Sequence, residues 1–282
     1  MERKRITIVG VGLIGGSLAL QLNEKGLAKG IIGVEENEAH ARKALELELV
    51  DEIRELDDAI DNSDLIVLAV PVDKMNELLP RILDKVEKQM VMDVGSTKQE
   101  LLSRVKHHPR RGRYVSTHPM WGTEYSGPQA AVKGAFENKA VVIVNGGESD
   151  ADALEWVKNA YKKIGMHLLS MNAADHDLHT AYISHISHIT SFALANTVLE
   201  KEKEEDAIFE LASAGFESTV RLAKSNPAMW VPILMQNREN VLDVLNEHIS
   251  QLRKFKSCLE KENYEYLQEL IENANKIRKI IK

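Results

Sequence analysis

Residues 6–17 read Ile-Thr-Ile-Val-Gly-Val-Gly-Leu-Ile-Gly-Gly-Ser, and they are the strongest indication of how the N-terminal half of the chain folds. The four β-branched residues before Gly10 predict a strand, and the spaced leucines around and after Gly15 predict a helix. A glycine-rich turn between a strand and a helix is typical of a unit that binds a dinucleotide. The alternative is a turn whose glycines serve only packing. An acidic residue at the end of the second strand favours the dinucleotide unit.

Each glycine of this turn has its own predicted role. Gly10 permits the tight turn, Gly12 lets the backbone approach a pyrophosphate, and Gly15 lets the helix pack closely on the strand. Leu13 and Ile14 begin the helix, where unpaired N–H groups and the positive end of the helix dipole attract phosphate. We therefore expect these five residues to contact the dinucleotide.

Glu35 is the acidic residue that identifies the dinucleotide. It follows the second predicted strand, at the place where such units carry a carboxylate for the ribose. A carboxylate there accepts hydrogen bonds from a 2′-hydroxyl and repels a 2′-phosphate. No arginine or lysine lies between Gly30 and His40. The sequence therefore predicts NAD rather than NADP as the cofactor.

Short apolar runs alternate with amphipathic segments over the first ~170 residues, which indicates repeated βα units around a mostly parallel sheet. Residues 13–25 and 75–88 have helical spacing. Ligands lie beyond the carboxyl ends of parallel strands, so we expect Val70 and Pro71, which also ends its strand, to contact the cofactor. The seven predicted strands are Arg5–Val9, Gly30–Val34, Leu65–Val70, Gln89–Val94, Tyr114–Thr117, Ala140–Asn145 and His167–Ser170.

The second part of the chain has a different texture. From Asp175 to Lys282 it has a single glycine, and apolar residues recur at helical spacing, as in 237–255 and 264–281. Residues 172–175 suit the entry to a first helix. We therefore predict an α/β fold of two domains, a Rossmann-like domain over 1–171 and an all-helical domain over 172–282.

Composition excludes several functional classes. The net charge of −7 argues against sequence-independent binding of nucleic acid, which requires a basic surface. No apolar run approaches the ~20 residues of a membrane span, and no signal-peptide pattern precedes the first strand. The single cysteine, Cys258, suits a reducing compartment. We expect a cytoplasmic protein with a small-molecule substrate, and neither nucleic acid nor a membrane as a partner.

Two predicted strand ends carry candidate catalytic side chains. Ser96 follows the fourth predicted strand, where it also reads as a capping box with Gln99. His118 follows the fifth, in a stiff turn formed with Pro119 and Gly122. A histidine titrates near neutrality and can take a proton from a hydroxyl as hydride leaves. From the residues alone, catalysis and a merely structural turn are equally good interpretations of His118.

The segment 175–188 is rich in histidine and resembles a metal site. At about 100° per residue, His176 and His185 lie on opposite sides of a helix, as do His179 and His188. The segment also contains no His-Glu-x-x-His motif, and we predict that the protein holds no metal. Asp177, Ser184 and His188 do align, as a polar stripe that faces either a ligand or solvent.

Taken together, these motifs resemble the prephenate and arogenate dehydrogenases of tyrosine biosynthesis. The resemblance covers nearly the whole chain in family order, so it is more specific than the glycine turn alone. It rests on 10–17, on 93–98 (Asp-Val-Gly-Ser-Thr-Lys), on 117–124 (Thr-His-Pro-Met-Trp-Gly-Thr-Glu), on 184–188, and on 215–223 with 227–230.

The resemblance implies a Rossmann-like domain, a helical domain that forms a homodimer, and NAD-dependent oxidative decarboxylation of prephenate to 4-hydroxyphenylpyruvate. The main alternative is the arogenate reaction, which gives tyrosine. In this family His118 would take the proton of the ring hydroxyl, and Ser96 would orient that hydroxyl. Arg221 would bind a substrate carboxylate, and His188 would lie near the substrate side chain. The other implied substrate-binding residues are Thr123, Glu124, Ser184 and Trp230.

Simpler interpretations of these residues stay open. Arg221 could pair with Glu217 four residues earlier on a helix, and Trp230 could serve core or dimer packing. Trp121 and Ser187 depart from the usual family residues, which leaves the pocket shape open. A β-hydroxyacid reductase would present a lysine between Asp175 and Leu199, where this chain has none. A non-catalytic NAD-binding sensor is the alternative from another class.

Overall fold

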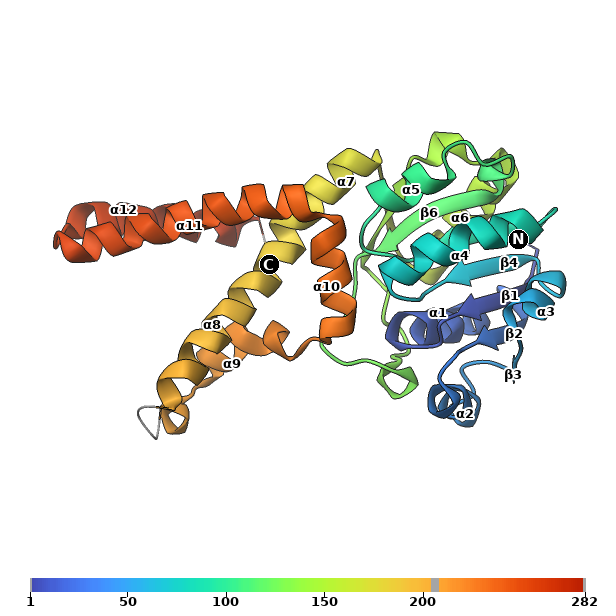
Figure 1. Ribbon diagram of the computed structural model, residues 1–282, viewed down its shortest axis with the longest axis horizontal. Coiled ribbons are helices and arrows are strands. Elements are labelled where there is room, and N and C mark those ends of the chain that lie inside the picture. Colours follow the sequence, from blue (N-terminus) through green and yellow to red (C-terminus); the bar gives the residue numbers. More distant parts are fainter. Residues whose placement is uncertain (1, 204–207, 281–282) are drawn as a thin grey trace. The chain divides into compact units, whose positions relative to one another are not determined.

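An eight-stranded sheet forms the centre of the N-terminal part of the chain (Figure 1). The protein is described by a computed structural model, which covers residues 2–203 and 208–280. The strand order across the sheet is β3-β2-β1-β4-β5-β6-β7-β8. All neighbours pair in parallel except β6 and β7, which are antiparallel. The strands are β1 (Lys4–Val9), β2 (Ala28–Val34), β3 (Glu52–Ile53), β4 (Leu65–Leu68), β5 (Met90–Asp93), β6 (Tyr114–Pro119), β7 (Ala140–Val144) and β8 (His167–Met171).

The structure confirms the mostly parallel sheet and all seven predicted strands. The sequence pattern missed β3, because two residues at the sheet edge leave no periodicity to detect. It also ended β6 too early. His118 is the fifth residue of β6 rather than part of the turn that follows, and it lies beside Val142 of β7.

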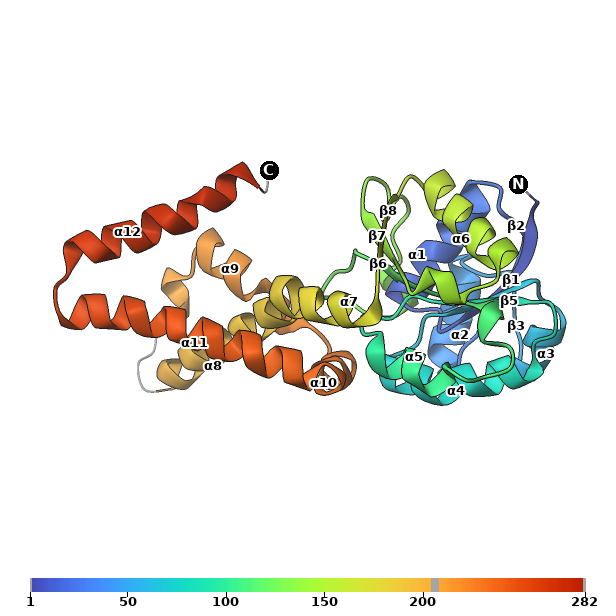
Figure 2. The same cartoon turned by 90° about the horizontal axis from the view of Figure 1, so that it is seen from above.

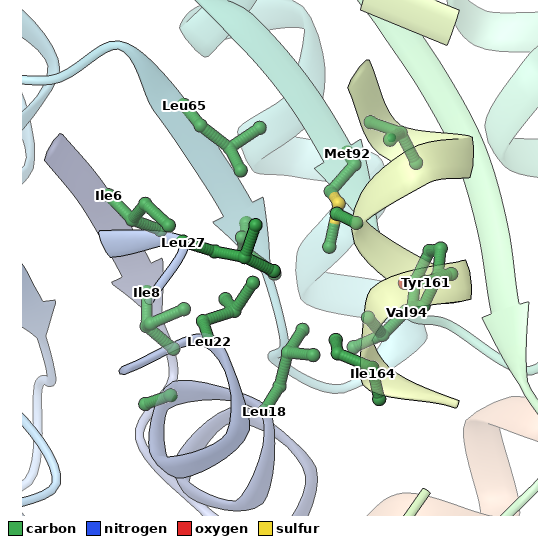
Figure 3. Close-up of a cluster of buried hydrophobic side chains, with 14 of the residues drawn as sticks. Ile6, Ile8, Leu18, Leu22, Leu27, Leu65, Met92, Val94, Tyr161 and Ile164 are labelled. Carbon is green, nitrogen blue, oxygen red and sulfur yellow. The ribbon is translucent and has the colours of Figure 1, made fainter. Parts of the chain in front are cut away.

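Helices cover both faces of the sheet (Figure 2). Alternate strand residues point to opposite faces, so Ile6 and Ile8 pack in one cluster, whereas Ile66 and Leu68 pack in the other. Fully burying such a side chain stabilises the fold by about 1.5–3 kcal/mol. The first face, shown in Figure 3, is covered by α1 (Leu13–Glu24), α2 (Glu38–Glu46) and α6 (Ala151–Ile164). The second is covered by α3 (Leu56–Asp61), α4 (Val72–Lys85) and α5 (Gln99–Val105).

From Ala173 onwards the described residues are helical or in loops, as predicted. The predicted entry at 172–175 is confirmed, because the Asn172 side chain caps α7 by accepting from the Asp175 N–H at 2.8 Å. The helices up to residue 237 are α7 (Ala173–Thr180), a π-helical turn (Ala181–His185), α8 (Ile186–Glu202), α9 (Ala214–Val220) and α10 (Pro227–Gln236). Short 3-10 helices span Arg111–Arg113, Pro128–Ala130, Gly146–Glu148, Phe209–Leu211, Arg221–Lys224 and Lys276–Lys279.

Two compact units make up the chain, over residues 1–237 and 238–282. The helices of 173–237 thus share the compact unit of the sheet, while the domain boundary expected after residue 171 stays a prediction. The second unit contains α11 (Arg238–Glu260) and α12 (Tyr264–Asn275), which form a helical pair (Figure 2). No helix within 2–203 or 208–280 has both the length and the apolar character to cross a membrane.

Candidate active site

The glycine turn has the shape that a dinucleotide requires. Gly10 has φ of +91°, and a Cβ on it would lie 2.8 Å from the Ala69 carbonyl oxygen. A Cβ on Gly15 would overlap the Gly10 carbonyl oxygen, so the helix and the turn are in direct contact there. At Gly12, by contrast, a Cβ would have no atom of the described residues within 4 Å. The backbone is therefore open at Gly12, where Leu13 and Ile14 begin α1, and this fits the approach of a phosphate.

Glu35 lies beside this turn. Its carboxylate accepts from the Val11 N–H and from the Asn37 N–H, each at 3.1 Å, and its side chain is 14% exposed. Val70 packs against Gly10, and Pro71 is the exposed N-cap residue of α4. The predicted cofactor residues therefore come together at the carboxyl ends of β1, β2 and β4, and they fit NAD.

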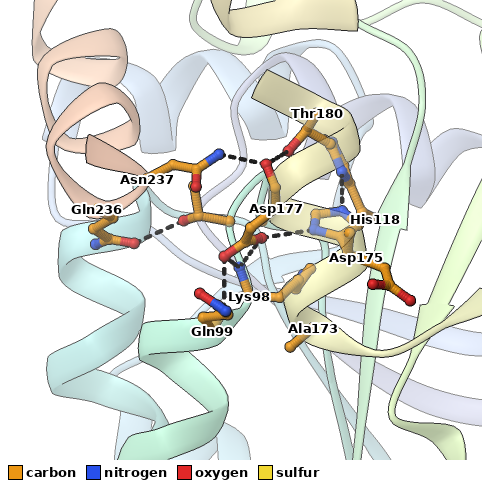
Figure 4. Close-up of polar contacts among 12 residues, drawn as sticks. Lys98, Gln99, His118, Ala173, Asp175, Asp177, Thr180, Gln236 and Asn237 are labelled. Carbon is orange, nitrogen blue, oxygen red and sulfur yellow. Dashed lines mark hydrogen bonds and ion pairs between the residues drawn. The ribbon is translucent and has the colours of Figure 1, made fainter. Parts of the chain in front are cut away.

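The start of α5 is capped by a distant residue rather than by a local capping box. The helix begins at Gln99 with Lys98 as N-cap, so the predicted cap by Ser96 is wrong. Instead the Asp177 carboxylate of α7 accepts from the Lys98 N–H at 2.9 Å and from the Gln99 N–H at 2.9 Å (Figure 4). A carboxylate binds these N–H groups more strongly than a hydroxyl does, because the helix dipole is positive there. Ser96 is left half-buried in the loop after β5.

A buried ion pair lies beneath this loop. The Lys98 ammonium pairs with Asp93 at the end of β5 and donates to the Thr117 carbonyl oxygen at 2.6 Å. Asp93 also accepts from the Tyr114 hydroxyl at 2.7 Å. Burial lowers the pKa of Lys98, and the charge of Asp93 opposes that shift. Neither Lys98 nor Asp93 stood out from the sequence as a site residue, although two charges at the end of an apolar strand were a usable signal.

His118 is the first residue of a hydrogen-bonded chain. Its Nδ1 is 2.8 Å from Nε2 of His176, and Nδ1 of His176 is 2.7 Å from the Asp177 carboxylate. His176 and Asp177 are both 1% exposed, whereas His118 is half-buried. Burial holds the pKa of His118 well below its usual range, and the charges of His176, Lys98 and His185 lower that pKa further. His118 is therefore neutral at neutral pH and can accept a proton.

The histidine-rich segment does not follow a regular α-helix. Residues 181–185 form a π-helical turn, which holds one more residue per turn than an α-helix. This insertion rotates the later residues by about 100°, so the prediction that His176 and His185 lie on opposite sides is wrong. Both are buried on the side of the site, and burial lowers the pKa of His185 to about 4. Among the described residues, no three His, Cys, Asp or Glu side chains could hold a metal ion, and metal independence stays a prediction.

His188 stacks on Trp230 with ring centroids 3.4 Å apart. Its Nδ1–H donates to the Ser184 carbonyl oxygen at 3.0 Å, which leaves Nε2 as an acceptor. Nε1 of Trp230 is buried without a hydrogen-bond partner in the described part of the chain. Trp230 also meets His185 edge-on, at 6.0 Å between centroids. Trp230 therefore joins His188 of α8 to the buried His185 of the histidine-rich segment.

Arg221 pairs with a residue that is 97 positions away. Its Nη1 is 2.7 Å from the Glu124 carboxylate, so the ion pair anticipated with Glu217 is not the one that forms. The Arg221 side chain is 50% exposed and that of Glu124 only 11%. Backbone hydrogen bonding and Arg221 lower the pKa of Glu124, against its desolvation. Burial lowers the pKa of His188, and the charge of Arg221 lowers it further.

The remaining predicted residues lie around these groups. Thr123 precedes Glu124 in the loop after β6, and its hydroxyl accepts from the Tyr125 N–H at 3.3 Å. Trp121 packs edge-on against Phe136 of the core, 5.4 Å between centroids, and Ser187 is exposed. Trp121 therefore packs against the core, whereas Ser187 lies on the surface of the single chain.

Two family models match the chain. The prephenate dehydrogenase nucleotide-binding domain matches residues 18–170, and the prephenate dehydrogenase dimerization domain matches residues 172–273. The prephenate dehydrogenase of Bacillus subtilis is 32% identical over 277 residues, which are 97% of this chain and 75% of that protein. The cyclohexadienyl dehydrogenase of Zymomonas mobilis is 28% identical over 99% of this chain and 96% of its own length.

A solved structure of the same kind of enzyme is similar to this chain over its whole length. The crystal structure of prephenate dehydrogenase from Aquifex aeolicus, in complex with hydroxyphenyl propionate and NAD+, has a TM-score of 0.91 to this chain. It is 29% identical and covers 100% of this chain and 99% of its own. The resemblance noted in the sequence, the fitted dinucleotide turn and these comparisons agree. The chain belongs to the prephenate dehydrogenase family, and it is an NAD-dependent oxidoreductase.

Proposed function

We propose that this chain catalyses the oxidative decarboxylation of prephenate to 4-hydroxyphenylpyruvate, with His118 as the base. The observation that carries the proposal is the half-buried, neutral His118 near the carboxyl end of β6, held by His176. As the hydroxyl proton passes to Nε2 of His118, the ring carbon that bears the hydroxyl loses hydride and becomes a carbonyl. The ring carboxylate then leaves as CO2, its electron pair completes the aromatic ring, and the carbonyl oxygen takes the proton back to become the phenol hydroxyl. Bound NAD supplies the hydride acceptor.

Ser96 and the second cluster complete the proposed site. Ser96, in the loop after β5, orients the ring hydroxyl. Arg221 binds the carboxylate of the substrate side chain, for which its half-exposed guanidinium fork is suited. His188 and Trp230 line the site with Ser184 and Thr123. The Aquifex aeolicus structure contains hydroxyphenyl propionate, a phenol with a carboxylate side chain, which supports a substrate of this shape.

A direct assay tests the proposed reaction. Prephenate and NAD are expected to give reduced nicotinamide and 4-hydroxyphenylpyruvate in equal amounts. His118→Asn should lower kcat by about 10²–10⁴-fold while the affinity for NAD persists. Wild-type turnover in this variant would remove His118 from its role. A protein that binds NAD but reduces none with either substrate would be a sensor instead.

The arogenate reaction is the second candidate, and Glu124 is the observation that favours it. Arogenate carries an ammonium beside its side-chain carboxylate, so it matches a site that presents a guanidinium and a carboxylate 2.7 Å apart. Initial rates with each substrate and each of NAD and NADP separate the candidates. In the arogenate case, Glu124→Gln raises the KM for arogenate and leaves the KM for prephenate unchanged or lower.

We also propose that the active form is a cytoplasmic homodimer built by the helical domain, with the domain boundary after residue 171. The name of the matching dimerization model supports the dimer. So do large apolar side chains exposed in the single chain, among them Leu252, Leu259, Tyr264 and Ile271. Sedimentation at micromolar concentration should give about 63 kDa, twice the 31.6 kDa of one chain.

A further inference from the structure

We propose that His176 and Asp177 are positioning residues, which set the tautomer of His118 and stabilise the cation that forms when His118 accepts its proton. This inference rests on the proposed role of His118 as the base. It assigns a function to a part of the histidine-rich helix that the proposed reaction does not otherwise use.

The hydrogen bonds of the chain determine where each proton lies. The Asp177 carboxylate can only accept, so Nδ1 of His176 carries the proton of their 2.7 Å bond. In neutral His176, Nε2 is then an acceptor, and the 2.8 Å bond requires that Nδ1 of His118 is the donor. Nε2 of His118 is consequently unprotonated. It is the only nitrogen of that ring that can take the hydroxyl proton.

The same hydrogen bonds stabilise the protonated state of His118. Once Nε2 has gained a proton, His118 carries a positive charge and donates through Nδ1 to His176, whose own donor is held by a carboxylate. Burial penalises this cation, and so do nearby positive groups. The groups that act on His118 are His176 on α7, Lys98 at the start of α5 and His185 in the π-helical turn. Burial lowers the pKa of His176 and so does the charge of Lys98, whereas the carboxylates of Asp177 and Asp93 favour the charged form of His176.

Asp177 also joins the base to the loop that carries Ser96. Its two oxygens accept from the Lys98 and Gln99 N–H groups while one of them accepts from His176 (Figure 4). One carboxylate thus fixes the start of α5 and the orientation of the histidine chain together. Asp175 and His179 are exposed on the same helix and take no part in the hydrogen bonds between His118, His176 and Asp177, so they serve as matched controls.

The test compares full-length variants in the presence of NAD and prephenate. His176→Leu removes the acceptor for His118 and should lower kcat at least about tenfold, with little change in the KM for prephenate or the Kd for NAD. His176→Gln retains an oxygen acceptor and should recover part of the loss. Asp177→Asn should move the acidic limb of the kcat/KM profile to lower pH, because the carboxylate no longer stabilises the imidazolium. Asp175→Asn and His179→Gln should behave as the wild type.

A nitrogen NMR spectrum of labelled histidine supplies a readout that does not depend on turnover. Nε2 of His118 should give an unprotonated signal in the wild type at neutral pH, and His176→Leu should lose this preference. The inference is overturned when His176→Leu keeps the wild-type kcat and tautomer. It is also overturned when Asp177→Asn lowers only the melting temperature and leaves the pH profile in place, since Asp177 is then merely a cap. A wild type that turns over neither substrate but shows this tautomer would instead refute the proposed function.

Discussion

His185 should make the free energy of unfolding fall at acidic pH, and the size of this effect follows from the pKa of its buried ring. This ring is 1% exposed, and Nδ1 is 3.1 Å from the Asn237 amide nitrogen, which donates to it. Protonation would expel that donor and place a charge in the core. Burial therefore lowers the pKa of His185 in the folded protein to about 4, from an ordinary value of 6.5.

The sign and the magnitude follow from these two values. Above pH 6.5 both states hold a neutral ring, and the folded state keeps its full stability. As the pH falls from 6.5 towards 4, the unfolded chain gains a proton that the folded chain does not, so stability is lost over that interval. Between pH 7 and pH 5 the loss due to this one residue is about 2 kcal/mol.

The perturbation is His185→Gln, which retains an oxygen acceptor for Asn237 but does not titrate. Urea unfolding at pH 7 and at pH 5 should show that the wild type loses about 2 kcal/mol more than the variant between these pH values. The exposed His179→Gln is the control and should lose as much as the wild type. A histidine NMR titration should place the His185 midpoint near 4. Equal losses in wild type and His185→Gln, or a midpoint near about 6.5, would refute the reasoning.

Three further predictions concern the cofactor turn, the buried ion pair and the substrate arginine. Gly15→Ala should lower the melting temperature and abolish NAD binding, because its methyl would overlap the Gly10 carbonyl oxygen. Gly12→Ala should weaken NAD binding at unchanged stability, because its methyl meets no atom of the described residues. Calorimetry measures both the melting temperature and the NAD affinity. Lys98→Met leaves the Asp93 carboxylate buried without its cation and should cost about 3–5 kcal/mol in denaturant unfolding; a loss under about 1 kcal/mol would contradict the described pair. Arg221→Ala should raise the KM for prephenate about 10–100-fold with the Kd for NAD unchanged, and the opposite pattern would place Arg221 at the cofactor.

The strands and the cofactor turn were predictable because their signals are local. A buried parallel strand is a short apolar run, and several of the seven predicted strands, such as Leu65–Val70, were visible as such runs. The turn at Gly10–Gly15 carries its own geometry, since each glycine is needed by the backbone within a few residues. β3 escaped prediction because two residues are too few for any pattern.

The partners of the site residues were not predictable, because packing decides them. Nothing near Ser96 in the chain indicates that Asp177 caps α5, or that Glu124 rather than Glu217 pairs with Arg221. The π-helical turn defeated the helical wheel for the same reason, since a regular period cannot detect an inserted residue. The βα units and the cofactor turn follow from the sequence alone, which also supplies His118 as the candidate base. Which nitrogen of His118 is unprotonated follows only from the packing of α7 beside β6 and α5, because that packing brings His118, His176 and Asp177 together.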